Sequence, residues 1–476
     1  MCKTETEGQG AAPAIGGNMR DILASIAALM ISISLLLLGN GLQGTLIGIR
    51  AQIEGFSTAM TGFLMSGYFI GHILGALYVP RMVGFVGHIR VFAGLASLAS
   101  AAALLHIVWI EPYFWAFLRG LTGACLAGLY LVTESWLNGR ADNSNRGKIF
   151  STYMVINLAS VGLGQQLMNL ADPAGFHLFV LGSVLFSLAV IPVALMRAPT
   201  PPIAETVRMK IKTLLKTSPV GTTGAFIGGL TNGAFWGMGP VYAYQSGLTT
   251  AQIAAFMSAV VFGGMALQWP LGFLSDRTDR RNVIALIAGG IAATGLVMAL
   301  TGSGVIWLLM MAAFFFGGFL LTLGALCTAH INDHVAQDEF VPASGTILLV
   351  VGLGAVAGPY LAALLMQALG AAALFYAISL LTAALLVYVL YARSIRTAPE
   401  KSGEFVPASG AMGGVVSLID PRRTYKNVRD KTRAARKKAA RAVKSAAVKT
   451  ARKTVKRKKK KNPAPTDEKT NPESSK

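Results

Sequence analysis

The chain has 476 residues, of which 53% are hydrophobic and only 13% are charged, and 53 are glycine. A water-soluble protein carries about a quarter charged residues, so this composition excludes a soluble globular fold, which would lack the polar surface needed to cover its interior. The formal net charge is +21, and residues 397–476 hold 23 Lys and Arg against 7 Asp and Glu, so most of the excess positive charge belongs to this C-terminal tail.

The three cysteines do not indicate a disulfide framework, because Cys2 is terminal while Cys125 and Cys327 fall inside apolar segments as packing residues. No P-loop, catalytic triad or metal-ligand spacing is recognisable, so we expect neither an enzyme nor a cofactor. The first apolar run, 22–49, is too long for the apolar region of a signal peptide, and no cleavable signal is expected.

Twelve apolar segments follow one another along the chain, each with roughly the 20 residues that a bilayer-crossing helix needs. They lie at 22–49, 57–79, 89–108, 113–135, 147–170, 175–196, 219–245, 251–274, 282–301, 305–329, 341–366 and 371–392. The breaks fall at turn-forming stretches such as Glu111-Pro112 and Asp172-Pro173. The predicted fold is an all-α membrane protein with twelve transmembrane helices.

One segment of the chain is repeated. GFSTAMTGFLMS at 55–66 recurs as GLTTAQIAAFMS at 247–258, and the Asn-Gly pair at Asn40 recurs at Asn232, both at a shift of 192 residues. The alternative is chance similarity between apolar helices. A near-constant shift favours a duplication, which in transporters places the binding site between the two repeats.

The duplication predicts two pseudo-symmetric six-helix halves. The expected divisions are an N-terminal segment at 1–21, a first half at 22–196, a linker at 197–218, a second half at 219–392, and a disordered basic tail at 393–476.

The distribution of basic residues predicts the orientation. If both termini are cytoplasmic, the outer loops hold only Arg50, whereas the inner segments up to the loop after the eighth span hold Arg20, Arg81, Arg90, Arg140, Arg146, Lys148, Arg197, Arg208, Lys210, Lys212, Lys216, Arg277, Arg280 and Arg281. This asymmetry follows the positive-inside rule. We expect the N-terminal segment, the linker and the tail to be cytoplasmic.

The loop after the eighth span reads Gly272-Phe-Leu-Ser-Asp276-Arg277-Thr-Asp279-Arg280-Arg281. This arrangement resembles the major facilitator superfamily, whose loop between the second and third helix of each half carries G-x-x-x-D-R-x-G-R-R. Asp279 stands where the family usually has its second glycine. The resemblance implies a transporter of two six-helix halves, with a conformational gate at this loop.

The gate needs acidic partners for its arginines. In the first half Arg81 keeps the basic position, although the Asp of the motif is missing there, and Glu134 ends the fourth span. In the second half Asp333 ends the tenth span, 199 residues after Glu134. We therefore expect Arg81 to pair with Glu134, and Arg277 with Asp333; ordinary interfacial charge at helix ends is the alternative. The predicted gate and charge relay comprises Arg81, Glu134, Gly272, Asp276, Arg277, Arg281 and Asp333.

An arginine inside the fourth span is a functional candidate by default, because charge inside a membrane is unfavourable. The superfamily has an arginine at this place, and here it is Arg119, followed by Gly120-Leu-Thr-Gly123. The alternative is an arginine that extends to the membrane interface. A Gly-Pro pair at Gly358-Pro359 resembles a motif of superfamily exporters, but here it falls in the eleventh span, whereas exporters carry it in the fifth.

Other sequence motifs, such as Glu134-Ser-Trp-Leu-Asn138 and Gln268-Trp-Pro-Leu-Gly272, resemble those of the YcaD-like group of bacterial inner-membrane facilitators. This resemblance covers about residues 22–392. The resemblance implies a secondary active transporter in that membrane, and it brings proton coupling and export as expectations; we expect a monomer. The alternative is a non-transporting sensor or scaffold that acts through its tail.

Few polar residues lie deep in the spans, and polar groups in a bilayer tend to face a cavity. The predicted substrate cavity comprises Asn40, Gln43, Arg119, Asn157, Gln165, Asn232, Trp236 and Gln268. For any single amide, a hydrogen bond between helices is the alternative. The prevalence of amides and aromatics suggests a neutral or amphipathic small molecule. For the tail, anionic lipid and nucleic acid are both candidate partners.

Overall fold

The computed structural model describes residues 19–140, 146–196, 209–336 and 339–395, which belong to one compact unit. Nearly all of the predicted N-terminal segment and basic tail, and residues 197–208 of the predicted linker, lie outside the described residues; the rest of the linker contains a short helix. The first half contains α1 (Met19–Ile53), α2 (Thr58–Val86), α3 (His88–Val108), α4 (Pro112–Arg140), α5 (Arg146–Gln166) with the 3₁₀ turn η1 (Leu167–Leu170), α6 (His177–Leu188) and α7 (Val190–Ala194). The second contains α8 (Ile211–Thr217), α9 (Pro219–Gln245), α10 (Thr250–Arg277), α11 (Arg280–Thr301), α12 (Ile306–Asn332), α13 (Phe340–Leu369) and α14 (Ala373–Ile395).

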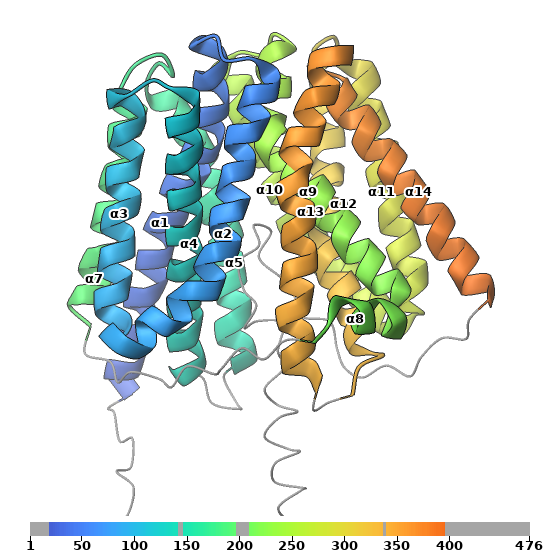
Figure 1. The fold of residues 1–476 in the computed structure, drawn as a ribbon, viewed down its shortest axis with the longest axis horizontal. Coiled ribbons are helices and arrows are strands. Elements are labelled where there is room, and N and C mark those ends of the chain that lie inside the picture. The colour runs from blue at the N-terminus through green and yellow to red at the C-terminus, as the bar shows by residue number, and fades with distance from the viewer. Residues whose placement is uncertain (1–18, 141–145, 197–208, 337–338, 396–476) are drawn as a thin grey trace, which may run out of the picture. The chain divides into compact units, whose positions relative to one another are not determined.

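The predicted fold class is confirmed. Every predicted span corresponds to a long helix, except that the fifth ends in η1 and the sixth is divided into α6 and α7 at Ala189. Ten helical segments of the described chain are long and apolar enough to cross a membrane; α5 and α9 are not among them. α9 is buried along most of its length, so it does not need a lipid-facing apolar surface. Figure 1 shows the two halves side by side.

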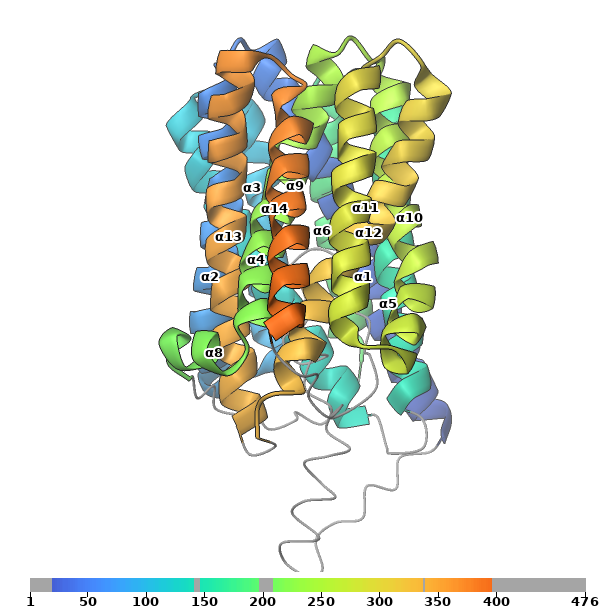
Figure 2. The ribbon, with the colours of Figure 1, turned by 90° about the vertical axis from the view of Figure 1, so that its right-hand side faces the viewer.

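The two ends of the bundle differ in charge. One end, which we call the basic face, carries the α2–α3 and α10–α11 turns and the short helix α8, and includes Arg81, Arg90, Lys212, Arg277 and Arg280. The other end, the opposite face, carries the α1–α2 and α9–α10 turns. α8 is tied to the start of α13, because Met209 N–H donates to the Pro342 carbonyl (3.1 Å) and Thr346 Oγ1 donates to the Met209 carbonyl (2.7 Å). Figure 2 shows α8 near that end of α13.

The repeated segment forms the same local structure in both halves. Gly55 has φ +77° and Gly247 has φ +79°, a region that glycine enters without strain. Each is followed by an N-cap: the Ser57 side chain accepts a hydrogen bond from Met60 N–H, and the Thr249 side chain accepts one from Gln252 N–H. The duplicated residues therefore end one helix and start the next in the same way.

Packing within the halves also repeats. A Cβ at Gly71 would collide with the Gly120 carbonyl oxygen of α4, and a Cβ at Gly263, 192 residues later, would collide with the Phe314 carbonyl oxygen of α12. Small residues at such positions let helix backbones approach closely in a membrane. The α2–α4 and α10–α12 crossings are thus both main-chain contacts.

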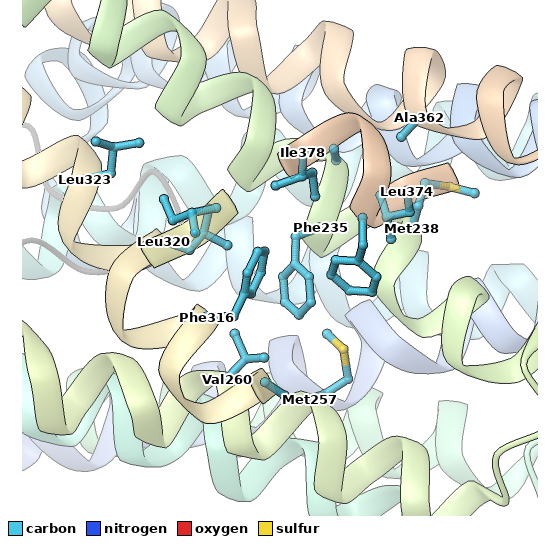
Figure 3. Packing of buried hydrophobic residues seen from close by; sticks show 14 of the residues in the cluster. Phe235, Met238, Met257, Val260, Phe316, Leu320, Leu323, Ala362, Leu374 and Ile378 are labelled. Atoms are coloured by element: carbon cyan, nitrogen blue, oxygen red, sulfur yellow. The ribbon is translucent and has the colours of Figure 1, made fainter. Parts of the chain in front are cut away.

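The second half is packed around an aromatic cluster. The rings of Phe235 (α9) and Phe316 (α12) have centroids 5.4 Å apart, and Phe375 (α14) lies 5.6 Å from Phe316 at an interplanar angle of 87°. Figure 3 shows Phe235 and Phe316 among the aliphatic and methionine side chains of α9, α10, α12 and α14. This aromatic packing joins three helices of the half into one unit.

Candidate substrate site and gating residues

The two halves are joined by hydrogen bonds near the opposite face. Gln245 Nε2 at the end of α9 donates to Gln52 Oε1 of α1 (2.9 Å) and to Thr58 Oγ1 of α2 (2.9 Å). Ala59 N–H at the start of α2 donates to Gln367 Oε1 of α13 (2.9 Å). One glutamine from each of two second-half helices thus holds the start of α2.

A second set of bonds lies one or two turns deeper, between α5 and α10. Gln166 Nε2 donates to Ser258 Oγ (2.7 Å), whose hydroxyl in turn donates to the Gly162 carbonyl (2.8 Å). The sequence predicted Gln165, not Gln166, as a residue between the halves. In the structure Gln165 accepts a hydrogen bond from Thr45 of its own half. Ser258 belongs to the repeated segment, and this is the sequence feature that could have identified the contact between α5 and α10.

The closest approach of the two halves that we identify is between α2 and α13. A Cβ at Gly62 would lie 2.7 Å from the Pro359 carbonyl oxygen and would collide with the Ala363 side chain. Figure 1 shows the halves meeting at the opposite face and diverging toward the basic face. The second half reaches the first mainly through α9, α10 and α13, and the first half meets it through α1, α2, α5 and η1.

At the basic face of this structure Arg277 does not pair with Asp333. Asp333 Oδ2 is paired with Arg280 Nε (2.8 Å), and Arg280 Nη2 also lies 3.2 Å from Asp276 Oδ1. The Arg277 guanidinium instead lies 4.0 Å from the centroid of the Phe273 ring. The reason is the turn: α10 continues to Arg277, and α11 begins at Arg280, whose side chain is directed between the ends of α10 and α12.

Asp279 accounts for the turn itself. Its side chain accepts a hydrogen bond from Arg281 N–H (3.0 Å), so it is the N-cap of α11, and it forms an ion pair with Arg281 Nη2 (2.8 Å). Burial raises the pKa of Asp279, but the hydrogen bonds and charge of Arg281 outweigh this effect and leave the pKa below its ordinary value. Gly272 is buried in α10, one turn before Asp276. The aspartate at the place of the family's second glycine therefore has a capping role.

The predicted pair in the first half is also absent. Arg81 is exposed, with its guanidinium 6.0 Å from the Tyr78 ring centroid. Glu134 is only 1% exposed, and it accepts a hydrogen bond from the Tyr153 hydroxyl (3.2 Å). Glu134 thus lies inside the half, whereas Arg81 lies at the surface of the bundle. Whether these residues act as a gate in another conformation remains a prediction.

Several predicted cavity residues are buried in the interior of the bundle. Asn157, Gln165 and Gln268 are almost fully buried, as is Gln43, whose two amide atoms both lack a hydrogen-bond partner. These residues come from α1, α5 and α10, helices through which the halves meet.

The repeat-related pair on α1 and α9 is only half-buried. Asn40 lies near the Tyr68 phenol, and Asn232 occupies the equivalent place on α9. Trp236, one turn after Asn232, packs against two buried clusters, each of which contains residues of both halves. The indole is thus located between the halves, while its Nε1–H makes no hydrogen bond.

Arg119 is buried within the first half. Its side chain is 5% exposed, and the guanidinium lies 4.5 Å from the centroid of the Tyr68 ring on α2. Its Nε and Nη1 atoms have no hydrogen-bond partner. The alternative of an arginine that reaches the membrane interface does not fit this burial.

Fold and site together define a membrane transporter of two repeated six-helix halves. The profile of the Major Facilitator Superfamily matches residues 29–331 and 222–459. The chain belongs to the Major Facilitator Superfamily, and it is an integral membrane protein.

Curated relatives include the MFS-type transporter YcaD of Escherichia fergusonii, 27% identical over 345 residues, which cover 72% of this chain and 89% of the relative. The YcaD of Salmonella arizonae is 26% identical over the same lengths.

Solved structures show the same fold at low sequence identity. The nucleoside transporter NupG matches with a TM-score of 0.67 at 11% identity, covering 78% of this chain and all of that one. A bacterial homologue of the human lysosomal transporter Spinster, in an inward-facing and unoccupied conformation, matches with a TM-score of 0.60 at 13% identity, covering 79% and 96%.

Proposed function

We propose that this protein is a secondary active transporter that moves a small molecule across the bacterial inner membrane by alternating access. The observation that carries the proposal is the set of contacts that close the two halves against each other at the opposite face, centred on Gly62 and Gln245. A site between duplicated halves then opens to one side at a time. The similarity to YcaD transporters supports the assignment to the inner membrane.

The basic face is the cytoplasmic face in this proposal. Its lysines and arginines, against Arg50 at the opposite face, follow the positive-inside rule. The contacts at Gly62 and Gln245 then close the two halves against each other on the outer side of the membrane.

Proton coupling and export are the finer parts of the proposal. A proton-coupled carrier needs a buried group that titrates during the cycle. Glu134 is the candidate, because it is a buried carboxylate hydrogen-bonded to a phenol, Tyr153. Transport in right-side-out and inverted vesicles, each with an imposed pH gradient, measures direction and coupling together.

The test of alternating access uses Gly62 and a matched glycine on the same helix. Valine at Gly62 would collide with α13, whereas Gly84 has no neighbouring atom within 4 Å of an added Cβ. A reporter cysteine at Ser66, a buried position on α2, is introduced into a background without Cys2, Cys125 and Cys327. An impermeant maleimide is then added from outside the cell.

Gly62→Val should increase labelling of the reporter, because it prevents closure at the opposite face, and Gly84→Val should leave labelling unchanged. Equal labelling of the two variants would contradict the proposed gate. A folded protein that transports nothing from a broad metabolite and drug panel would contradict the transporter assignment and favour the sensor or scaffold.

A further inference from the structure

Arg119 carries a charge that the described protein does not neutralise. Among the described residues, it makes no ion pair with a carboxylate, and two of its nitrogen atoms have no hydrogen-bond partner. A buried, unpaired cation is strongly unfavourable in a membrane protein. The structure therefore keeps this charge at some expense in stability, which calls for a functional reason.

No acid on the same helix can supply the missing charge. Glu111, eight residues before Arg119, is about 12 Å away along the helix axis, and Glu134, fifteen residues after it, is about 22 Å away. Each is engaged elsewhere: Glu111 accepts a hydrogen bond from Phe114 N–H (2.7 Å), and Glu134 accepts one from Tyr153. The counter-ion must come from outside the described helices.

The surroundings of Arg119 fit a small organic anion. The Tyr68 ring, at 4.5 Å, holds the guanidinium from one side by a cation–π contact. The buried Tyr68 hydroxyl lies beside the side-chain amide of Asn40 on α1. The amide of Gln43, one turn after Asn40 on the same helix, is buried and has no hydrogen-bond partner, so it can donate to a ligand, and the phenol can do so as well. A planar guanidinium presents two parallel N–H groups that match an oxyanion.

We infer that Arg119 binds the anionic group of the transported molecule, a carboxylate or a phosphate, with Tyr68 and Gln43 as neighbouring donors. This inference rests on the proposed transport function and narrows its substrate class. It replaces the neutral or amphipathic ligand expected from the sequence, because the single cation among the amides proves to be unneutralised.

The test uses full-length protein in detergent and in proteoliposomes, with compounds in matched sets. Each set holds an aromatic or aliphatic carboxylate, its primary carboxamide and the corresponding phosphate monoester; inorganic phosphate and chloride serve as controls for simple ion binding. The variants are Arg119→Gln and Arg119→Lys. Arg50→Gln is the matched control, because Arg50 is already paired with Glu54 at the opposite face.

We expect anionic members of some sets to raise the melting temperature and to be transported, while their carboxamides do neither. The carboxylate and phosphate arms identify which oxyanion is preferred. Arg119→Gln should weaken anion binding by roughly tenfold or more, which is the contribution of a hydrogen bond to a charged group, and Arg119→Lys should retain part of it. Without ligand, Arg119→Gln should melt at the wild-type temperature or above, because it removes an unpaired charge; a purely structural arginine would give a lower melting temperature.

Binding or transport of carboxamides as strong as that of their carboxylates would overturn the inference while leaving the transporter proposal intact. Anion binding that survives in Arg119→Gln would do the same, as would stabilisation by chloride and inorganic phosphate alone. If Arg119→Gln does not fold, the preference of the wild-type protein between carboxylate and carboxamide decides the matter. Binding is measured separately from transport. If the protein binds the anion but does not transport it, the proposed function is contradicted and the anion site is not.

Discussion

Arg280 and Asp333 form a buried ion pair, with Nε 2.8 Å from Oδ2, that joins the start of α11 to the end of α12. The same guanidinium also reaches Asp276 at the end of α10. One arginine thus ties three helices of the second half together at the basic face. Both members of the pair are 3% exposed or less, so the pair is shielded from water.

Replacing Arg280 should destabilise the protein far more than replacing Arg277. Arg280→Ala leaves the buried Asp333 carboxylate without this partner, a change that typically lowers the free energy of unfolding by about 3–5 kcal/mol. Arg277→Ala removes a contact with the Phe273 ring worth about 0.5–1 kcal/mol. Thermal unfolding in detergent measures the difference. Similar melting temperatures for the two variants would show that the Arg280 pair does not hold the three helices.

The equivalent glycines of the two halves should be equally intolerant of a side chain. Alanine at Gly71 or Gly263 would collide with a main-chain oxygen, which no rotamer change can relieve. Alanine at Gly44 or Gly324 meets no atom within 4 Å and should be tolerated or should stabilise its helix by up to about 1 kcal/mol. The yield of monodisperse protein after purification distinguishes the two pairs. Normal yields of both Gly71→Ala and Gly263→Ala would contradict the close crossings.

Trp236 should be required for transport, because it packs against two buried clusters that each contain residues of both halves. Trp236→Ala, and likewise Asn232→Ala, should alter the uptake or binding of a ligand found by screening, with expression unchanged. Trp269→Ala is the control, since that indole is 73% exposed on α10. Uptake as in the wild type for both Trp236→Ala and Asn232→Ala would remove them from the site.

The basic tail should be dispensable for folding and transport. Truncation after residue 400 removes most of the excess positive charge but none of the helices described here. The truncated protein should insert and transport normally, and it should bind anionic vesicles or nucleic acid more weakly, because each basic residue near a charged surface contributes about 1 kcal/mol. Flotation with anionic vesicles and gel-shift with nucleic acid separate the two partners. Loss of insertion or of transport would give the tail a structural role.

The sequence predicted the fold well because its signals are local and repeated. Apolar length alone located the spans, and the segment beginning at Gly55 and Gly247 proved to form the same turn and cap in both halves. The partner of Asp333 in this structure was harder to predict, because the choice between Arg277 and Arg280 depends on where α10 ends and how Asp279 starts α11. Those are details of a two-residue turn, and a shift of one residue rotates a helical side chain by about 100°.

The expectation of a neutral ligand arose for a different reason from the choice between Arg277 and Arg280. Counting side-chain types gives each amide the same weight as Arg119, but whether a charge is neutralised depends on which acids lie close in space. Only the structure shows that Glu111 and Glu134 are engaged elsewhere.

The glycine crossings also determine which parts of the molecule can move. Where Gly71 touches the α4 backbone and Gly263 touches the α12 backbone, main-chain atoms are already in contact, so the two helices can neither slide nor tilt without collision. Each half must therefore turn as one block. The seam between the blocks includes side-chain hydrogen bonds, such as those of Gln245 and Gln166, which can be broken singly and replaced by water. The low-energy path for motion in this protein thus runs along that seam, with Gly62 as the pivot at which the blocks come nearest.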